Sequence, residues 1–150
     1  MVKYVLLCLS GFVIQVHAAL ETIQQLHFGE LAVTSTSVVS RVTVPISGPS
    51  WSDGAIHILK PGQSGLFRVT GLTPFRFIRL TPLMPQLTDP VMTSDGFELT
   101  SVDMPSVLTT DANGTVTFPV GGVIRTRMIT GEGYFNSDYH IYLTISIDYE

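Results

Sequence analysis

Apolar and polar side chains alternate along much of the chain, which is the pattern of half-buried β-strands. The clearest alternation is at the C-terminal end, where every second position from 139 to 149 is apolar or aromatic. These residues are Tyr139, Ile141, Leu143, Ile145, Ile147 and Tyr149. The spacing predicts a core strand over 139–149 with one buried face, about 36 Å long. The sequence has no convincing helical period.

Shorter alternations, separated by turn residues, predict the other strands. The expected strands are 26–33, 38–46, 55–59, 65–70, 75–81, 97–102, 115–120, 123–129 and 139–149. Eight to nine short strands at this spacing are typical of a sandwich or barrel. A chain of 150 residues fits one domain. We therefore expect an all-β protein with a single immunoglobulin-like, Greek-key β-sandwich over residues 19–150.

Glycines mark the places where the backbone is expected to need special geometry. The expected structural turn residues are Gly29, Gly71, Gly114, Gly121, Gly122 and Gly133. The run Asp111-Ala112-Asn113-Gly114 predicts the tip of a hairpin that leads into 115–120. The pair Gly121-Gly122 predicts a break between two strands. The segment 81–94 contains three prolines and is expected to be a rigid excursion instead of a strand.

Residues 1–18 have the organisation of a signal peptide. Lys3 precedes an apolar run from Tyr4 to Val16, and small residues follow at Ala18 and Ala19. The run of about 13 residues is too short for the roughly 30 Å of a bilayer's hydrocarbon core. We expect cleavage after Ala18 or Ala19, and a protein exported to the periplasm, the cell surface or the medium. No later apolar run has membrane length, so no membrane span is expected after cleavage.

Composition narrows the classes of function. Apolar residues make up 45% of the chain and charged residues 13%, which favours a folded core over disorder. The formal net charge is −4 and the sequence contains no basic patch, so a nucleic-acid partner is not expected. The one cysteine, Cys8, lies in the expected leader, so the mature chain would have no disulfide.

The sequence offers no set of residues for catalysis or metal binding. His27, His57 and His140 lie far apart, and Asp138 with His140 would supply two ligands where zinc needs three or four. The run from Gly62 to Gly65 does not have the Gly-x-Ser-x-Gly spacing of a hydrolase nucleophile. We therefore expect a protein that is not an enzyme and has no catalytic, cofactor-binding or metal-binding residues.

Five stretches of the chain together carry a family resemblance. They are residues 26–31, 65–71, 111–122, 133–135 and 145–149. Their order and spacing resemble DUF4402, a bacterial family of exported domains of unknown function, with Asn136 where the family usually has a glycine. That family is similar in layout to spore-coat-U-like and chaperone–usher pilus subunits, which share a signal peptide, an immunoglobulin-like sandwich and a penultimate tyrosine, here Tyr149.

The resemblance implies a non-enzymatic exported structural subunit of a pilus-like or other cell-surface assembly. Its partners would be copies of itself or other surface subunits. Pilus subunits of that type lack one strand, which the N-terminal segment of a neighbour supplies. Residues 19–28 make a poor donor because Thr22 and Gln24 interrupt the apolar row, which favours this segment as the domain's own first strand.

A second function stays open on the residues alone. The chain would then be a stand-alone secreted binding or adhesin module, with Trp51, Tyr134 and Tyr139 as platforms on which a ligand stacks. That reading predicts a monomer with an exposed aromatic patch. A secreted hydrolase is the least favoured reading, because it needs a cleft with a nucleophile and base or two carboxylates.

Overall fold

A computed structural model describes residues 18–84, 96–127, 134 and 138–150. Within these residues the protein has eleven β-strands and no helix, and all strand pairs are antiparallel. The strands are β1 (Ala19–Gln24), β2 (Glu30–Val33), β3 (Arg41–Val44), β4 (Trp51–Ser52), β5 (Ile56–Lys60), β6 (Gly65–Thr70), β7 (Phe77–Leu83), β8 (Phe97–Asp103), β9 (Val107–Thr109), β10 (Val116–Thr126) and β11 (Thr144–Tyr149). The all-β prediction is confirmed.

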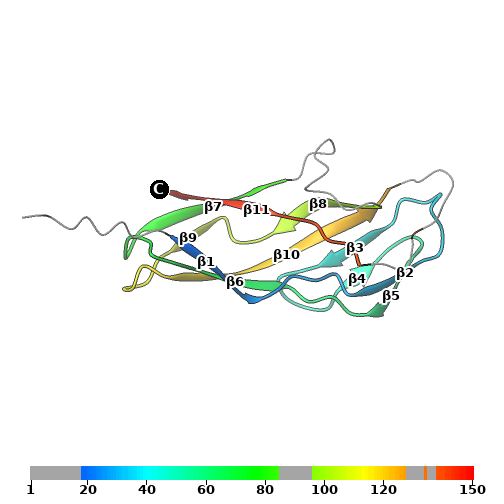
Figure 1. Cartoon of the computed structure of the whole chain (residues 1–150), viewed down its shortest axis with the longest axis horizontal. Helices are drawn as coiled ribbons and strands as arrows, with labels where there is room; N and C mark the ends of the chain where they lie inside the picture. Colours follow the sequence, from blue (N-terminus) through cyan, green and yellow to red (C-terminus); the bar gives the residue numbers. More distant parts are fainter. Residues whose placement is uncertain (1–17, 85–95, 128–133, 135–137) are drawn as a thin grey trace, which may run out of the picture.

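The long strand β10 organises the largest sheet, which runs through the middle of the elongated molecule in Figure 1. Its first half, Val116–Val120, pairs with β6, and β6 in turn pairs with β1. Its second half pairs with β3 on one side and β8 on the other. The sheet order is therefore β1-β6-β10-β3-β4, with β8 joined to β10.

The predicted break at Gly121-Gly122 is wrong, because β10 runs through both glycines without interruption. A Cβ atom on Gly121 would lie 2.3 Å from the carbonyl oxygen of Val44 in β3. At Gly122 it would lie 3.1 Å from the carbonyl oxygen of Ser101 in β8. Glycine is present here because two neighbouring backbones approach β10 closely, and not because the chain turns.

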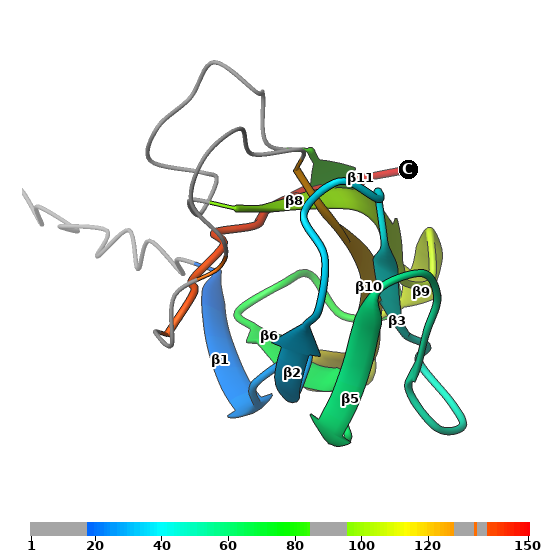
Figure 2. The same ribbon diagram turned by 90° about the vertical axis from the view of Figure 1, so that its right-hand side faces the viewer.

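A second layer covers this sheet. It is the three-stranded sheet β11-β7-β9, seen above β6 and β10 in Figure 1. A further pair, β2 with β5, closes the other end of the molecule and faces the viewer in Figure 2. The arrangement is a β-sandwich, as expected. Its immunoglobulin-like, Greek-key connectivity stays a prediction.

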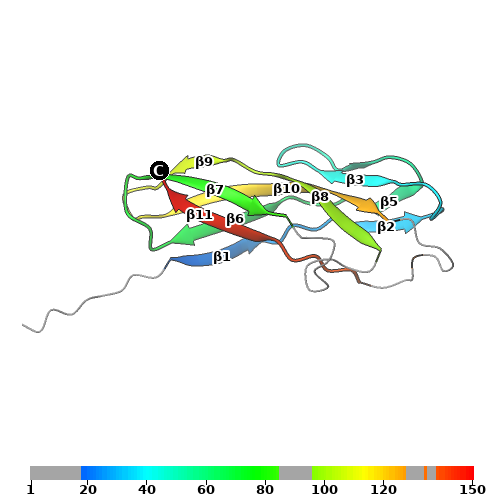
Figure 3. The ribbon, with the colours of Figure 1, turned by 90° about the horizontal axis from the view of Figure 1, so that it is seen from above.

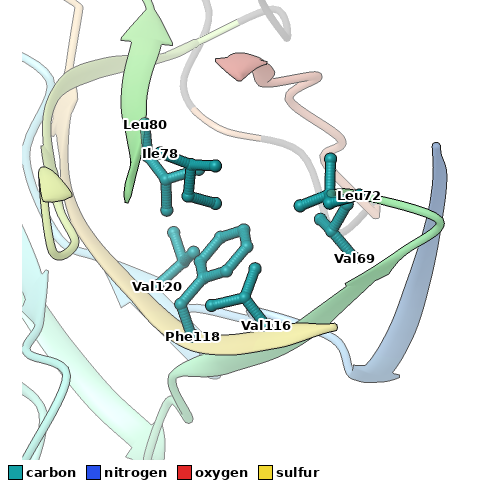
Figure 4. Packing of buried hydrophobic residues seen from close by; sticks show 7 residues of the cluster. All are labelled: Val69, Leu72, Ile78, Leu80, Val116, Phe118 and Val120. Carbon is teal, nitrogen blue, oxygen red and sulfur yellow. The ribbon is translucent and has the colours of Figure 1, made fainter. Parts of the chain in front are cut away.

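The core has two parts that follow these layers. Between β6 and β10 on one side and β7 on the other, the ring of Phe118 is completely buried (Figure 4). Its neighbours are Val69, Leu72, Ile78, Leu80, Val116 and Val120. The second part lies toward β2 and β5 and consists of Val42, Ile56, Phe97, Leu99 and Ile124.

Several strand boundaries differ from the prediction. Two strands were not predicted, β4 and β9, and β11 begins at Thr144 instead of residue 139. Strand β1 confirms that the segment after residue 18 is the domain's own first strand, because it pairs with β6. From Tyr139 to Leu143 the side chains still alternate between half-buried and exposed, but no strand of the described part pairs with this stretch. Alternation of apolar and polar residues indicates which side chains are buried, but a strand also needs a hydrogen-bonded neighbour.

The proline-rich excursion also begins later than expected. Strand β7 continues through Pro82 to Leu83, in register with Thr144 and Ile145 of β11. The rest of the predicted excursion, from residue 85, lies outside the described residues.

The turn at Asp111–Gly114 is present, but it is not a hairpin tip. The carboxylate oxygen Oδ1 of Asp111 accepts hydrogen bonds from the backbone N–H groups of Asn113 and Thr115, both at 2.8 Å. The strands on either side, β9 and β10, pair with different partners and not with each other. The turn therefore carries the chain from one layer of the sandwich to the other.

Candidate functional site: an apolar groove between the first and last strands

A groove of about 1660 Å³ opens along one side of the sandwich. The N-terminal segment from Leu20 to Val33 forms one wall, and the C-terminal segment from Asp138 to Ile145 forms the other. Its floor consists of apolar side chains of β6, β8 and β10, such as Phe67 and Val120. A groove of this size is large enough to admit part of another molecule.

Two strand edges flank the groove. Strand β1 pairs with β6 on one side, and β11 pairs with β7 on one side. On their other sides, neither strand has a partner strand within the described residues. In Figure 3 the arrows of β1 and β11 point in opposite directions. An unpaired edge presents a row of backbone N–H and C=O groups that can pair with a further strand.

The β1 wall is thinly packed. The side chains of Ala19 to Ile23 are all exposed, with Leu20 at 59% and Ile23 at 43%. The positions of β1 that line the groove are Leu20 and Thr22, and the Gln24 side chain donates a hydrogen bond to the carbonyl oxygen of Ser64. Because the side chains from Ala19 to Ile23 are exposed, β1 pairs with β6 through its backbone but does not fill the sandwich at this edge.

The C-terminal wall is more apolar. Tyr139, Ile141, Leu143 and Ile145 line the groove, so most of the predicted C-terminal core face borders open space. Ile147 lies further along, where it packs against the Phe118 cluster. This wall and the floor both contribute apolar side chains to the groove.

Tyr149, the last predicted residue of that face, lies at the end of the sheet and is 54% exposed. Its hydroxyl accepts the backbone N–H of Thr73 at 3.0 Å. This hydrogen bond lowers the pKa of Tyr149, because it stabilises the phenolate. Tyr149 therefore ties the end of β11 to the turn that follows β6.

An aromatic cluster lines part of the groove. The ring of Phe97 lies 4.8 Å from that of Tyr134 and 5.1 Å from that of Tyr139, measured between centroids. The hydroxyl of Tyr134 donates to the carbonyl oxygen of Gly96 and accepts the backbone N–H of Arg127 at 2.9 Å. Burial raises the pKa of Tyr134, since the phenolate would be poorly solvated there.

Charged groups lie at the rim of the groove. Lys60 Nζ and Glu30 Oε2 are 2.5 Å apart across the β2–β5 pair, and both side chains are exposed. The hydrogen bond and charge of Glu30 raise the pKa of Lys60. His27, Asp138 and His140 also border the opening. The groove therefore has an apolar interior and a polar rim, which suits a peptide better than a charged small molecule.

The predicted turn glycines fall into different environments. Gly29, Gly71 and Gly114 have φ values of +88°, +77° and +68°, a region that favours glycine. Gly29 also lines the groove, where a Cβ atom would lie 2.1 Å from the carbonyl oxygen of Lys60. Gly121 and Gly122 lie within β10, and Gly133 lies outside the described residues.

The three proposed stacking platforms do not come together. Tyr134 and Tyr139 both line the groove and both contact Phe97, whereas Trp51 is 53% exposed in β4 and does not line it. Sequence analysis expected a first strand within 19–28 and a strand over 97–102, but it did not find that β1 and Phe97 border one groove. Strand patterns along the chain do not indicate which edges lie side by side.

In the part of the chain that the structure describes, no three His, Cys, Asp or Glu side chains lie close enough together to hold a metal ion. The same residues contain no helix long and apolar enough to cross a membrane. His27 and His140 both border the groove, and His57 lies in β5.

The fold and the groove define a β-sandwich with an open, apolar side between its first and last strands. The family model for a domain of unknown function, DUF4402, matches residues 19–149, so the chain belongs to the DUF4402 family. Comparison with curated proteins and with solved structures found no match.

Proposed function

We propose that the protein is a non-enzymatic, exported structural subunit of a pilus-like or other cell-surface assembly. Its groove would receive an extended strand from a neighbouring subunit, either another copy or a different surface protein. The observation that carries the proposal is the apolar groove flanked by the edges of β1 and β11.

An extended strand fits this groove for two physical reasons. Its backbone would hydrogen-bond to the edge of β1 on one side and the edge of β11 on the other. Every second side chain would point into the groove and bury apolar area against residues such as Phe67, Leu143 and Ile145. The wall from Asp138 to Ile145 is eight residues long, so the strand would cover about 26 Å.

Export supports the same function. Residues 1–18 have the pattern of a signal peptide, and the chain after them has no cysteine. An exported domain without disulfides needs stabilisation from its core or from partners. A donated strand would supply it by closing the sandwich. We place the mature protein in the periplasm, at the cell surface or outside the cell.

The alternative function is a stand-alone binding or adhesin module, and one observation favours it. Tyr134 and Tyr139 contact Phe97 in the lining of the groove, and Tyr142, which also lines it, is 64% exposed. Aromatic faces of this kind bind flat ligands such as sugar rings by stacking. A binding module would be a monomer whose ligand protects these tyrosines.

The test is the mass of the protein in solution. The full chain is produced with its own leader in a bacterial periplasm, and the product is measured by light scattering and on an unboiled gel. We expect oligomers that collapse to about 14 kDa on boiling. A stable monomer at all concentrations would contradict assembly and favour the binding module.

A pair of variants ties the assembly to the groove. Ile145→Asp places a charge in the groove, while Thr144→Asp places the same charge on the exposed face of the same strand. We expect the first variant to stay monomeric at concentrations where the second assembles like the wild type. Equal assembly of both variants would show that the groove is not the contact.

A further inference from the structure

The turn between β9 and β10 contains an asparagine whose side chain the fold does not use. The chain has two asparagines, Asn113 and Asn136, and the first begins the run Asn113-Gly114-Thr115. An asparagine followed at the second position by threonine or serine, with no proline between them, is the acceptor pattern for an N-linked oligosaccharide. The chain is rich in serine and threonine, so the surroundings of Asn113 decide what this pattern means.

The hydrogen bonds that form this turn come from Asp111. Its carboxylate accepts the backbone N–H groups of Asn113 and Thr115, and its carbonyl oxygen accepts the N–H of Gly114 at 3.1 Å. Aspartate at the first position and glycine at the fourth are typical of a type I β-turn, whose third position accepts most residues. The turn therefore does not require asparagine at position 113.

The side chain of Asn113 is exposed and free to react. The residue takes part in the turn only through its backbone, and its amide group has no hydrogen-bond partner among the described residues. Its φ is not positive, so it does not adopt the left-handed conformation for which asparagine is often used in turns. The preceding residue, Ala112, is exposed as well, which leaves the amide accessible to a large enzyme.

The position of the turn leaves room for a bulky group. The turn projects at one end of the elongated molecule, where β9 leads into β10 (Figure 1). Gly114 packs against the backbone of Leu72 and fixes the base of the turn. None of the residues 111–115 lines the groove, so an oligosaccharide on Asn113 leaves the groove open to a donated strand.

We propose that Asn113 is an acceptor site for an N-linked oligosaccharide. The donor is an oligosaccharide carried on a polyprenyl diphosphate, and a transferase of the host catalyses the step. Nδ2 of Asn113 bonds to the anomeric carbon of the sugar, the bond from that carbon to the diphosphate oxygen breaks, and the amide loses one proton as polyprenyl diphosphate leaves. This site rests on the export included in the proposed function, but not on the groove.

A hydrated sugar chain suits the surface of this protein. Charged residues make up only 13% of the chain, about half the usual share of roughly 25%. An oligosaccharide adds bulk and hydration to a surface without adding charge. It would therefore keep an exported domain with few charges soluble.

The test is the mass of the protein purified from the cells that encode it, with the modified peptide located by tandem mass spectrometry. We expect a chain without its leader that carries added sugar on Asn113. Asn113→Gln and Thr115→Ala should each remove all of the added mass, the second while leaving Asn113 in place, and Thr115→Ser should retain it. The matched control is Asn136→Gln, which changes an asparagine outside the acceptor pattern and should also retain the added mass.

Stability is measured alongside. Because the Asn113 amide makes no hydrogen bond in the described chain, Asn113→Gln should melt at the same temperature as wild-type protein produced without the transferase. If Asn113→Gln does not fold, the comparison of Thr115→Ala with Thr115→Ser decides, since both keep Asn113.

Four results would overturn the inference. An exported chain with its leader removed and Asn113 unmodified overturns it and leaves the proposed function standing. An unmodified chain that keeps its leader inside the cell contradicts both. Added sugar that persists in Asn113→Gln lies on another residue, and conversion of Asn113 to aspartate without added sugar is deamidation.

Discussion

Gly114 lies directly against Leu72. A Cβ atom at position 114 would be 1.9 Å from the carbonyl oxygen of Leu72, while the Leu72 N–H donates to the carbonyl oxygen of Gly114 at 3.0 Å. The turn from β9 to β10 is therefore docked on the segment that follows β6. This contact continues the pairing of β6 with β10 beyond the ends of both strands.

Gly114→Ala should be strongly destabilising. The added methyl group meets the backbone of Leu72 and also has to accept φ +68°, so we expect a loss of about 2–4 kcal/mol in the free energy of unfolding. The matched control is Gly48→Ala, where φ is +95° but nothing lies within 4 Å of the added atom. Denaturant unfolding should give a loss of only about 1 kcal/mol there, and equal losses would show that the Leu72 contact does not matter.

Phe118→Ala should test the core between the layers. The Phe118 ring is fully buried against Ile78 and the valines of β10, so its removal leaves a cavity and should cost about 3–5 kcal/mol. Thr117→Ala changes the exposed neighbour on the same strand and should cost much less. A loss under about 1 kcal/mol at Phe118, measured by denaturant unfolding, would contradict this packing.

The two perturbed tyrosines predict opposite effects at high pH. The folded-state pKa of Tyr134 lies above the unfolded value of about 10, so its contribution to stability is present below pH 10 and is lost as the pH rises through the folded pKa. The folded-state pKa of Tyr149 is lowered, so its contribution is present above the unfolded pKa and is lost as the pH falls through the folded pKa.

The melting temperature, measured by circular dichroism from neutral pH to about pH 11, checks these signs. Relative to the wild type, Tyr134→Phe should lose less stability over the alkaline range, and Tyr149→Phe should lose more. At neutral pH, Tyr134→Phe should already be less stable, because the carbonyl of Gly96 loses its hydroxyl donor. If the melting temperatures of all three proteins change with pH in parallel, the environments assigned to Tyr134 and Tyr149 are contradicted.

Sequence alone predicted the parts of the fold that depend on local signals. Strand β6 was predicted with its observed limits, because glycines bracket an apolar run at Gly65 and Gly71. The predicted break at Gly121-Gly122 was wrong. These glycines make room for the backbones of β3 and β8, which are distant from them in sequence. From Tyr139 to Leu143, alternation predicted burial correctly but could not show that no strand of the described residues pairs with this stretch.

The groove could not be predicted from the sequence, because its two walls come from opposite ends of the domain. Its C-terminal wall was identified as an apolar face, but its other wall, β1, has polar residues at Thr22 and Gln24 that interrupt the alternation. That these two ends of the chain lie on either side of one opening follows only from the pairing of β1 with β6 and β11 with β7.

The central claim is that a strand from another subunit occupies the groove. Amide hydrogen exchange, measured on the assembled protein and on the wild-type monomer, tests it most directly. Assembly should slow exchange in β1 and in β11 together, because an inserted strand bonds to both edges, while the already paired amides of β10 change little. Assembled protein in which β1 and β11 exchange as fast as in the monomer would contradict the account.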